Sequence, residues 1–392
     1  MKFRTSTAAI FFFIALVIPV CLAAQGVSPA IISFDAPGAD TAAGSTNGTL
    51  ANGINASGAI TGIYYDVSSV SHAFLRDPAG NFTTVDFPGA DGTEANSIND
   101  LGTITGIYYD VNGSHGFVRD AQGNFTTFNV ANAIDIFPVA IGMQGTIVGY
   151  YLDSNSLYHA FLRFPDGSLK TFVGHHSCNT GTSAGCFGSE DGNINALGAS
   201  VGSYEDNTGN FVSHILMRSA EGKFTTFDAP GAGTGMYQGT GCPGCSPGIN
   251  QAGAIAGIYT DANKVFHSFL RSSDGVFTQI DATGAGTGVG QGTGCFSDCA
   301  VGLNASGMIM GTYIDASNVF HGFLRSAAGE FATIDPPNSV GTRAQSINDS
   351  GAITGYYIDA NNVFHAFLTV PYKVGAVPKR ASARFGLPQA GK

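Results

Sequence analysis

The sequence predicts an all-β fold, a seven-bladed β-propeller with four-stranded blades, and three observations support that prediction. First, one pattern recurs seven times: Asn-x-x-Gly, Ile-x-Gly-x-Tyr, Asp, a short loop, His-x-Phe-Leu-Arg and Phe-x-Thr-Ile-Asp. Second, the Gly that closes the Ile-x-Gly segment returns every 43 to 55 residues, a period typical of blades, solenoid coils or arrays. Third, the last copy of the pattern is completed by a segment at the opposite end of the chain.

Each repeat contains four β-branched or aromatic runs that we expect to form strands. In the second repeat they cover residues 97–99, 103–109, 115–119 and 125–128. The Asn-x-x-Gly segment suits a tight turn, because Asn bonds its own backbone and Gly accepts a positive φ. No part of the chain after residue 24 shows a sustained helical period. The repeats begin near residues 51, 95, 138, 192, 248, 302 and 344.

The two chain ends decide between an open solenoid and a closed ring. The seventh repeat stops after residues 365–368 and lacks its Phe-x-Thr-x-Asp strand. The segment 32–38 near the start of the chain matches the corresponding segment 85–89 of the first repeat. We therefore expect the N-terminal strand to complete the last blade, which leaves only short, protected sheet edges. The predicted propeller covers residues 25–370 as one domain.

Both termini outside the propeller have distinct compositions. Residues 1–24 read as a secretory signal peptide, with Lys2 and Arg4, an apolar run over 8–20 and small residues at Ala23 and Ala24. Residues 371–392 are basic and rich in Pro, Gly and Ala, so we expect a disordered tail. No other segment is long and apolar enough to span a membrane. The predicted location is secreted or extracytoplasmic: periplasm, cell surface or extracellular space.

The charge balance argues against nucleic acid as a partner. Seven of the 17 basic residues lie within the first four residues or beyond Pro371, so the propeller keeps ten against all 28 acidic residues. Its net charge of about −18 lacks the clustered Lys and Arg that nucleic-acid binding needs. We expect a monomer whose partner is a glycan or a cell-surface protein.

Cysteines occur in three close pairs once Cys21 leaves with the signal peptide. The pairs lie in the three longest repeats, between the fourth strand and the next blade: Cys178 with Cys186, Cys242 with Cys245, and Cys295 with Cys299. An even, locally paired set in an exported chain predicts disulfides. Zinc is the alternative, since Cys-x-x-Cys and the neighbouring His175 and His176 offer ligands. The spacings differ between loops and Gly surrounds each pair, so we predict neither a metal nor a cofactor.

Histidine and aspartate recur once per repeat, and we interpret them as scaffold. The histidines are His72, His115, His159, His214, His267, His321 and His365. Each follows an Asp at the end of the preceding strand: Asp66, Asp110, Asp153, Asp206, Asp261, Asp315 and Asp359. Seven equivalent pairs indicate a structural hydrogen bond across the hairpin rather than a general base with its carboxylate. The recurring arginines, such as Arg76, are expected to pair with Asp35, Asp86, Asp228, Asp281 and Asp335.

The repeat resembles the bacterial extracellular repeat proteins of the HAF family. Residues 72–74, 159–161 and 365–367 carry the His-Ala-Phe triplet intact, and the resemblance extends from about Ile32 to Leu368. Other copies differ: the fourth reads His214-Ile215-Leu216, and the third has Gly142 in place of the turn Asn. The family resemblance implies secretion and a repeat fold, and it supplies no catalytic residues.

Two function classes remain open from the sequence. One is a secreted recognition module for an extracellular glycan or protein; the other is a propeller hydrolase or lyase acting on polysaccharide, which needs residues that break the repeat. Residues outside the repeat include Glu190 and Asp191, but they form no recognised catalytic spacing. Three long loops, 174–191, 232–247 and 283–300, should share one sector of one face. The ligand-binding residues predicted there are His175, His176, Tyr237, Gln238, Gln291, Phe296 and Asp298.

Overall fold

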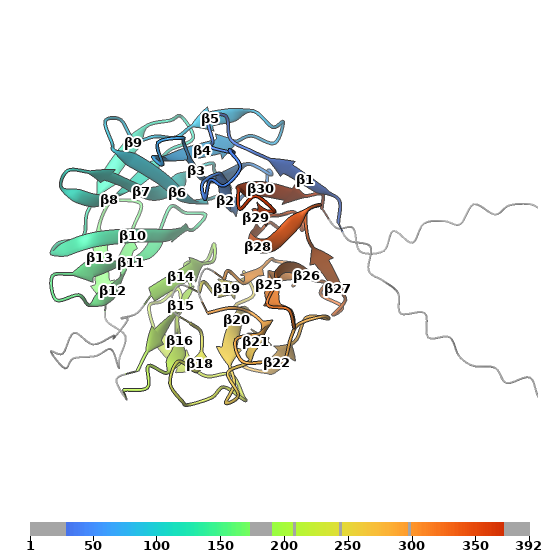
Figure 1. Cartoon of the computed structure of the whole chain (residues 1–392). Helices are drawn as coiled ribbons and strands as arrows, with labels where there is room; N and C mark the ends of the chain where they lie inside the picture. The colour runs from blue at the N-terminus through green and yellow to red at the C-terminus, as the bar shows by residue number, and fades with distance from the viewer. Residues whose placement is uncertain (1–28, 173–189, 207–208, 243–244, 297–298, 372–392) are drawn as a thin grey trace, which may run out of the picture.

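Seven four-stranded antiparallel units surround a common centre (Figure 1), which confirms the predicted β-propeller. The computed structural model describes residues 29–172, 190–206, 209–242, 245–296 and 299–371. The predicted signal peptide 1–24 lies outside these residues, as does the predicted tail from residue 372 onward. Among the described residues, no helix could cross a lipid bilayer.

The first three blades follow the chain in order, each from its innermost to its outermost strand. Blade 1 contains β2 (Thr49–Ile54), β3 (Ile60–Tyr65), β4 (Ser71–Arg76) and β5 (Phe82–Thr84). Blade 2 contains β6 (Gly92–Ile98), β7 (Ile104–Asp110), β8 (Gly113–Arg119) and β9 (Phe125–Phe128). Blade 3 contains β10 (Ala133–Ile141), β11 (Ile147–Asp153), β12 (Tyr158–Arg163) and β13 (Leu169–Phe172).

The next three blades have shorter innermost strands. Blade 4 contains β14 (Glu190–Ile194), β15 (Ser200–Glu205), β16 (Ser213–Arg218) and β17 (Phe224–Phe227). Blade 5 contains β19 (Gly248–Ile249), β20 (Ile255–Thr260), β21 (Phe266–Arg271) and β22 (Phe277–Ile280). Blade 6 contains β24 (Gly302–Leu303), β25 (Ile309–Ile314), β26 (Phe320–Arg325) and β27 (Phe331–Ile334).

Blade 7 is built from both ends of the chain, as the split repeat predicts. It contains β28 (Ser339–Ile347), β29 (Ile353–Asp359), β30 (Phe364–Thr369) and, as its outermost strand, β1 (Ile31–Phe34). β1 pairs antiparallel with β30, with Ile32 opposite Leu368. The main-chain amide of Val370 extends this ladder by donating to the Ala30 carbonyl oxygen at 2.8 Å. The ring is therefore closed by hydrogen bonds between residues more than 300 positions apart.

Two short strands in the long loops join neighbouring blades into one larger sheet. β18 (Gly239–Thr240) pairs with β16 of blade 4 and with β20 of blade 5. β23 (Gly292–Thr293) does the same between β21 of blade 5 and β25 of blade 6. Blades 4, 5 and 6 consequently form a single hydrogen-bonded sheet of 14 strands.

The Gly of the Ile-x-Gly segment makes room for the Phe of His-x-Phe. A Cβ built on Gly62 would meet the Leu50 carbonyl oxygen, and it would lie 2.9 Å from Cε1 of Phe74. Phe74 is 1% exposed and belongs to the core between blades 7 and 1. The same pairing recurs at Gly311, whose Cβ would lie 2.8 Å from Phe323. The Gly and the Phe therefore recur together because the Phe ring packs in the space that a side chain at the Gly would fill.

The turn asparagines link successive blades through side-chain amides. Each Oδ1 accepts main-chain N–H groups of its own turn, as Asn55 does from Ala59 at 3.0 Å. Each Nδ2 donates to the equivalent main-chain carbonyl of the following blade. These bonds run from Asn55 to Asn99, Asn99 to Gly142, Asn195 to Asn250, Asn250 to Asn304, Asn304 to Asn348 and Asn348 to Asn55, over 3.0 to 3.4 Å. Gly142 has no side chain, so blade 3 makes no such bond to blade 4.

Candidate ligand-binding site

The repeated histidines all occupy one kind of environment. Each ring stacks on the Tyr that precedes the strand-end Asp, with centroids 4.8 to 5.2 Å apart. Each Nε2 lies 3.0 to 3.8 Å from the carboxylate of that Asp. The Tyr stacking and the Asp contact at Nε2 are alike in all seven blades, so these contacts distinguish no single His as a catalytic base. The stacking Tyr is a third member of this unit, and the sequence reasoning did not assign it a role.

A second carboxylate holds the other ring nitrogen in five blades. Nδ1 lies 2.7 to 3.0 Å from an Asp just beyond the outermost strand, in the pairs His72–Asp86, His214–Asp228, His267–Asp281, His321–Asp335 and His365–Asp35. The hydrogen bond with Asp281 raises the pKa of His267, and Asp228 does the same for His214. In blade 2 an amide takes this place, because His115 Nδ1 lies 2.9 Å from Oδ1 of Asn129.

The expected pairing of these Asp residues with the repeated arginines is wrong. The carboxylates face the histidines, and the guanidinium groups lie over Phe rings instead. Arg76 lies 4.8 Å from the ring centre of Phe34, and Arg271 lies 4.5 Å from that of Phe227. The Asp residues pair with histidine because its ring projects from the end of the strand that lies next to the Asp turn. The arginines lie at the opposite end of the same strand.

The long loops after blades 4 and 5 fold back onto the hairpin loop of the blade they leave. The Tyr237 amide donates to the Asn210 carbonyl oxygen at 2.9 Å, and the Gly290 amide donates to that of Lys264 at 2.8 Å. Gln238 and Gln291 then fasten each loop to the next blade. Gln238 accepts from the Gly235 amide at 2.7 Å and donates to the Ala262 carbonyl oxygen at 3.2 Å.

Gln291 repeats these contacts, with Gly288 as donor and with Ala316 and Asn318 as acceptors. Asn47, in the loop after blade 7, also reaches the next hairpin loop, at Ser69. Both ends of each Gln amide are therefore used within the loops, and we assign the two glutamines to loop attachment rather than to ligand contact.

Tyr237 and Phe296 come together on the surface with a third ring, Phe211. The rings of Phe211 and Tyr237 stack, with centroids 5.6 Å apart and planes at 11°. Phe296 meets Tyr237 edge-on at 6.0 Å. Tyr237 and Phe296 are each 46% exposed, so the cluster opens to solvent. We call Phe211, Tyr237 and Phe296 the aromatic cluster.

Two members of the aromatic cluster adopt backbone conformations that bulky residues avoid. Phe211 has φ of 51° and Tyr237 has φ of 58°. At the position of Phe211 the other hairpin loops carry Gly, Ser, Lys or Asn, and at the position of Tyr237 the second long loop carries Gly290. Strain of this kind concentrates at ligand sites.

Sequence reasoning missed Phe211 because it lies in a hairpin loop rather than in a long inter-blade loop. The available signal was the length of that loop. It spans residues 206–212, where the corresponding loop of blade 1 spans only 66–70.

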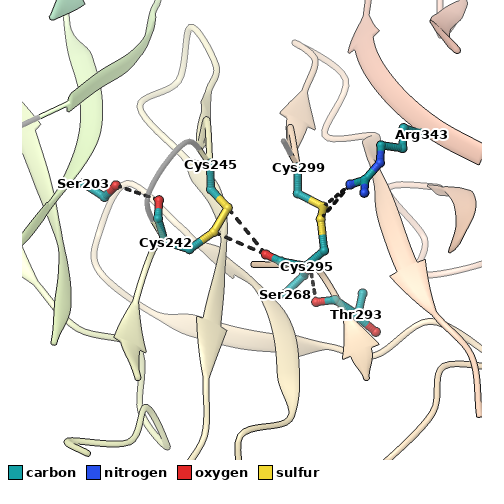
Figure 2. Close-up of a disulfide and its surroundings, with 8 residues drawn as sticks. All are labelled: Ser203, Cys242, Cys245, Ser268, Thr293, Cys295, Cys299 and Arg343. Atoms are coloured by element: carbon teal, nitrogen blue, oxygen red, sulfur yellow. Dashed lines mark hydrogen bonds between the residues drawn. A yellow bond between two sulfur atoms is a disulfide. The ribbon is translucent and has the colours of Figure 1, made fainter. Parts of the chain in front are cut away.

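Two disulfides stand side by side beneath these loops (Figure 2), joining Cys242 to Cys245 and Cys295 to Cys299. The sulfur atoms of the first pair lie 3.3 and 3.5 Å from the Cys295 carbonyl oxygen. Arg343 Nη1 lies 3.1 Å from Sγ of Cys295, and its guanidinium covers the Phe320 ring at 4.2 Å. All four cysteines are buried, so the disulfides fix the bases of the loops. They also favour an oxidising, extracytoplasmic environment.

Several predicted residues lie outside the described part of the chain. These are His175, His176, Asp298 and the pair Cys178 and Cys186. Within the described residues, no group of three or more His, Cys, Asp or Glu side chains is arranged to hold a metal ion.

A cavity of about 580 Å³ is lined by residues from the innermost strands of all seven blades. Its wall combines aliphatic side chains with amides and hydroxyls, for example Ile98, Asn96 and Ser346. Glu94 of β6 also lines it, and sequence reasoning did not single this residue out. The available signal was a carboxylate at only two of the seven copies of this strand position, Glu94 and Glu190.

Comparison with solved structures gives β-propellers. A streptogramin B lyase matches with a TM-score of 0.53 and 12% identity, covering 87% of this chain and 98% of that one. Virginiamycin B lyase from Staphylococcus aureus matches with a TM-score of 0.52 and 12% identity, over 87% and 100%. The β-propeller domain of the trilobed protease from Pyrococcus furiosus matches with a TM-score of 0.54 and 9% identity, over 83% and 96%. The fold is a β-propeller.

At these identities the likeness concerns the fold alone. No family model and no curated protein matches the sequence. The resemblance to the HAF family therefore stays a prediction.

Proposed function

We propose that the protein is a secreted recognition module that binds an extracellular glycan through the aromatic cluster. The observation that carries the proposal is the exposed stack of Phe211 and Tyr237, both in left-handed backbone conformations that equivalent loops fill with smaller or polar residues. An aromatic face gives an apolar platform for the C–H face of a sugar ring. The Tyr237 hydroxyl has no hydrogen-bond partner among the described residues, so it can serve a sugar hydroxyl.

The size and charge of the region favour a neutral saccharide. Tyr237 and Phe296 are each less than half exposed, so the cluster is far smaller than the roughly 800 Å² that each partner contributes to a stable protein interface. The net negative charge of the chain disfavours an anionic polysaccharide. A site this small suits one or two sugar units.

The test uses substitutions copied from the protein's own equivalent loops. Tyr237→Gly installs the residue found at position 290, and Phe211→Asn installs the residue found at positions 318 and 362. Met236→Val, which copies Val289 beside the cluster, is the matched control. On a neutral-glycan array followed by calorimetry, we expect both aromatic variants to lose at least tenfold in affinity, and the control to bind like the parent. Equal binding by all three variants would remove the site.

The same samples address the alternative, a propeller-fold polysaccharide hydrolase or lyase. Incubation with the glycans that bind, followed by chromatography of the products, separates the two classes. Binding without product supports recognition, and turnover supports the enzyme. In the described residues all seven histidines share the same Tyr stacking and the same Asp at Nε2, and this repetition favours the recognition class.

A further inference from the structure

The central cavity is a second candidate site, separate from the aromatic cluster. Its volume of about 580 Å³ falls within the range of small-molecule pockets, roughly 300–1,000 Å³. It is lined by the innermost strands, whereas the aromatic cluster lies on hairpin and inter-blade loops. A ligand in one need not touch the other.

Glu94 is the only charged side chain among the described residues that line this cavity. At the equivalent strand position blade 1 has Leu50, blade 3 has Phe137 and blade 6 has Cys299, whereas blade 4 has a second carboxylate, Glu190. Blade 7 has Arg343, whose guanidinium is engaged by the Cys295–Cys299 disulfide and the Phe320 ring. Glu94 is therefore not dictated by the repeat, and it is the charge that the described side chains bring to the cavity wall.

The groups around Glu94 stabilise its negative charge only in part. Tyr109 donates a hydrogen bond to its carboxylate, and Tyr65 of the preceding blade lies close by. Burial raises the pKa of Glu94 despite that bond. A carboxylate in such a place gains from a ligand that brings a positive charge.

An aromatic pair on the adjacent blade faces the same cavity. Phe137 and Tyr150 both line it, and their rings stack at 4.8 Å with planes at 22°. Blades 2 and 3 are tied together at this level, because Asn96 Nδ2 donates to the Pro138 carbonyl oxygen at 2.9 Å. Aromatic faces attract organic cations, and more strongly where water is excluded.

We propose that the central cavity binds a small organic cation, with its ammonium group between the Glu94 carboxylate and the Phe137–Tyr150 pair. The amides of Asn52, Asn96 and Gln345 also line the cavity and suit hydroxyl groups on the rest of the ligand. An amino sugar combines these features. The site requires no part of the aromatic cluster and stands if the glycan proposal fails.

The test compares cations with neutral molecules of the same shape. Calorimetry is run with glucosamine against glucose, and with choline against 3,3-dimethylbutan-1-ol, at a pH where the amine is protonated. We expect at least one cation to bind about tenfold more tightly than its neutral counterpart. We expect Glu94→Gln to abolish that preference. Glu330→Gln, which removes an exposed carboxylate elsewhere, should leave it unchanged.

Two further variants keep the result decisive. Phe137→Leu retains the carboxylate and should weaken the binding of the cation more than that of the neutral molecule, even if Glu94→Gln fails to fold. Tyr237→Gly should bind the cation like the parent protein, which separates this site from the aromatic cluster. The proposal is overturned if neither cation binds, or if the preference for the cation survives in Glu94→Gln.

Discussion

The side-chain amide of Asn348 in the last blade donates to the main-chain carbonyl oxygen of Asn55 in the first blade at 3.0 Å. This bond is one of six equivalent bonds that connect the turns of neighbouring blades. It shows that the seam closed by β1 is also fastened near the centre of the ring. The circuit is broken between blades 3 and 4, where Gly142 stands in place of Asn.

Restoring the missing Asn should stabilise the protein. Gly142 has an ordinary φ, and a Cβ there would make only normal contacts, the shortest at 3.4 Å to Cγ2 of Ile194. We expect Gly142→Asn to raise the free energy of unfolding by about 1 kcal/mol, through one buried hydrogen bond and a stiffer unfolded chain. Denaturant unfolding measures the change. Gly142→Ala is the control for chain stiffness alone, and equal gains in both variants would refute the amide bond.

Removing the N-terminal strand should open the ring. Deletion of residues 25–38 takes away β1 and leaves the edge of β30 unpaired. We expect a clear loss of thermal stability together with aggregation, measured by calorimetry and light scattering. Deletion of residues 372–392, which lie within the predicted tail 371–392, serves as the control and should change neither quantity. An unchanged melting temperature after the first deletion would show that β1 does not contribute to closure.

Stability should fall as the pH rises above neutrality, because of the histidine–aspartate pairs. The pKa values of His214 and His267 are raised in the folded protein from an ordinary value of 6.5. The folded state therefore holds these protons more tightly, so the stabilisation is complete below about pH 6.5 and is lost as the pH rises through the folded values. Unfolding measured between pH 5.5 and 8.5 should show this decline. Asp281→Asn should flatten it, and an identical profile would contradict the assignment.

The Ile-x-Gly glycine should tolerate no side chain. Gly62→Ala would place a methyl group against the Leu50 carbonyl oxygen and the buried Phe74 ring. We expect a loss of about 1–3 kcal/mol in unfolding free energy, as for other overpacked cores. Gly341→Ala is the matched control, since its nearest neighbour is Cβ of Phe320 at 3.9 Å. A Gly62→Ala protein as stable as this control would show that the motif has another cause.

The fold could be predicted from the sequence because every repeat carries the same strand and turn residues at the same spacing. The Gly62–Phe74 pairing, the Asn55 turn and the split seventh repeat each follow from local sequence, so each can be predicted without knowledge of the rest of the fold. The joining of blades 4 to 6 by β18 and β23 could not be predicted. Those strands are two residues each, in Gly-rich segments, and they pair only because neighbouring blades present free edges.

The candidate site was predicted only in part because contacts between blades, which the sequence does not show, determine the position of some of its residues. Tyr237 and Phe296 lie in the two similar Gly-rich loops, and the unusual length of these loops was the reason for predicting both residues as ligand contacts. Gln238 and Gln291 stand in the same loops, yet their amides are bound to backbone atoms of the next blade, a contact that depends on blade spacing. Phe211 lies in a lengthened hairpin loop and Glu94 lies in a repeat strand, so only an alignment of the seven blades would have singled them out.

The pairing of β1 with β30 also orders events during synthesis. The strand made first belongs to the blade made last, so residues 31–34 must wait until residues 364–369 have emerged. At ordinary elongation rates that delay is roughly 20 to 70 s. A chain cut short at any point before β30 keeps β1 without its pairing partner. Closure of the ring therefore requires synthesis as far as residue 369.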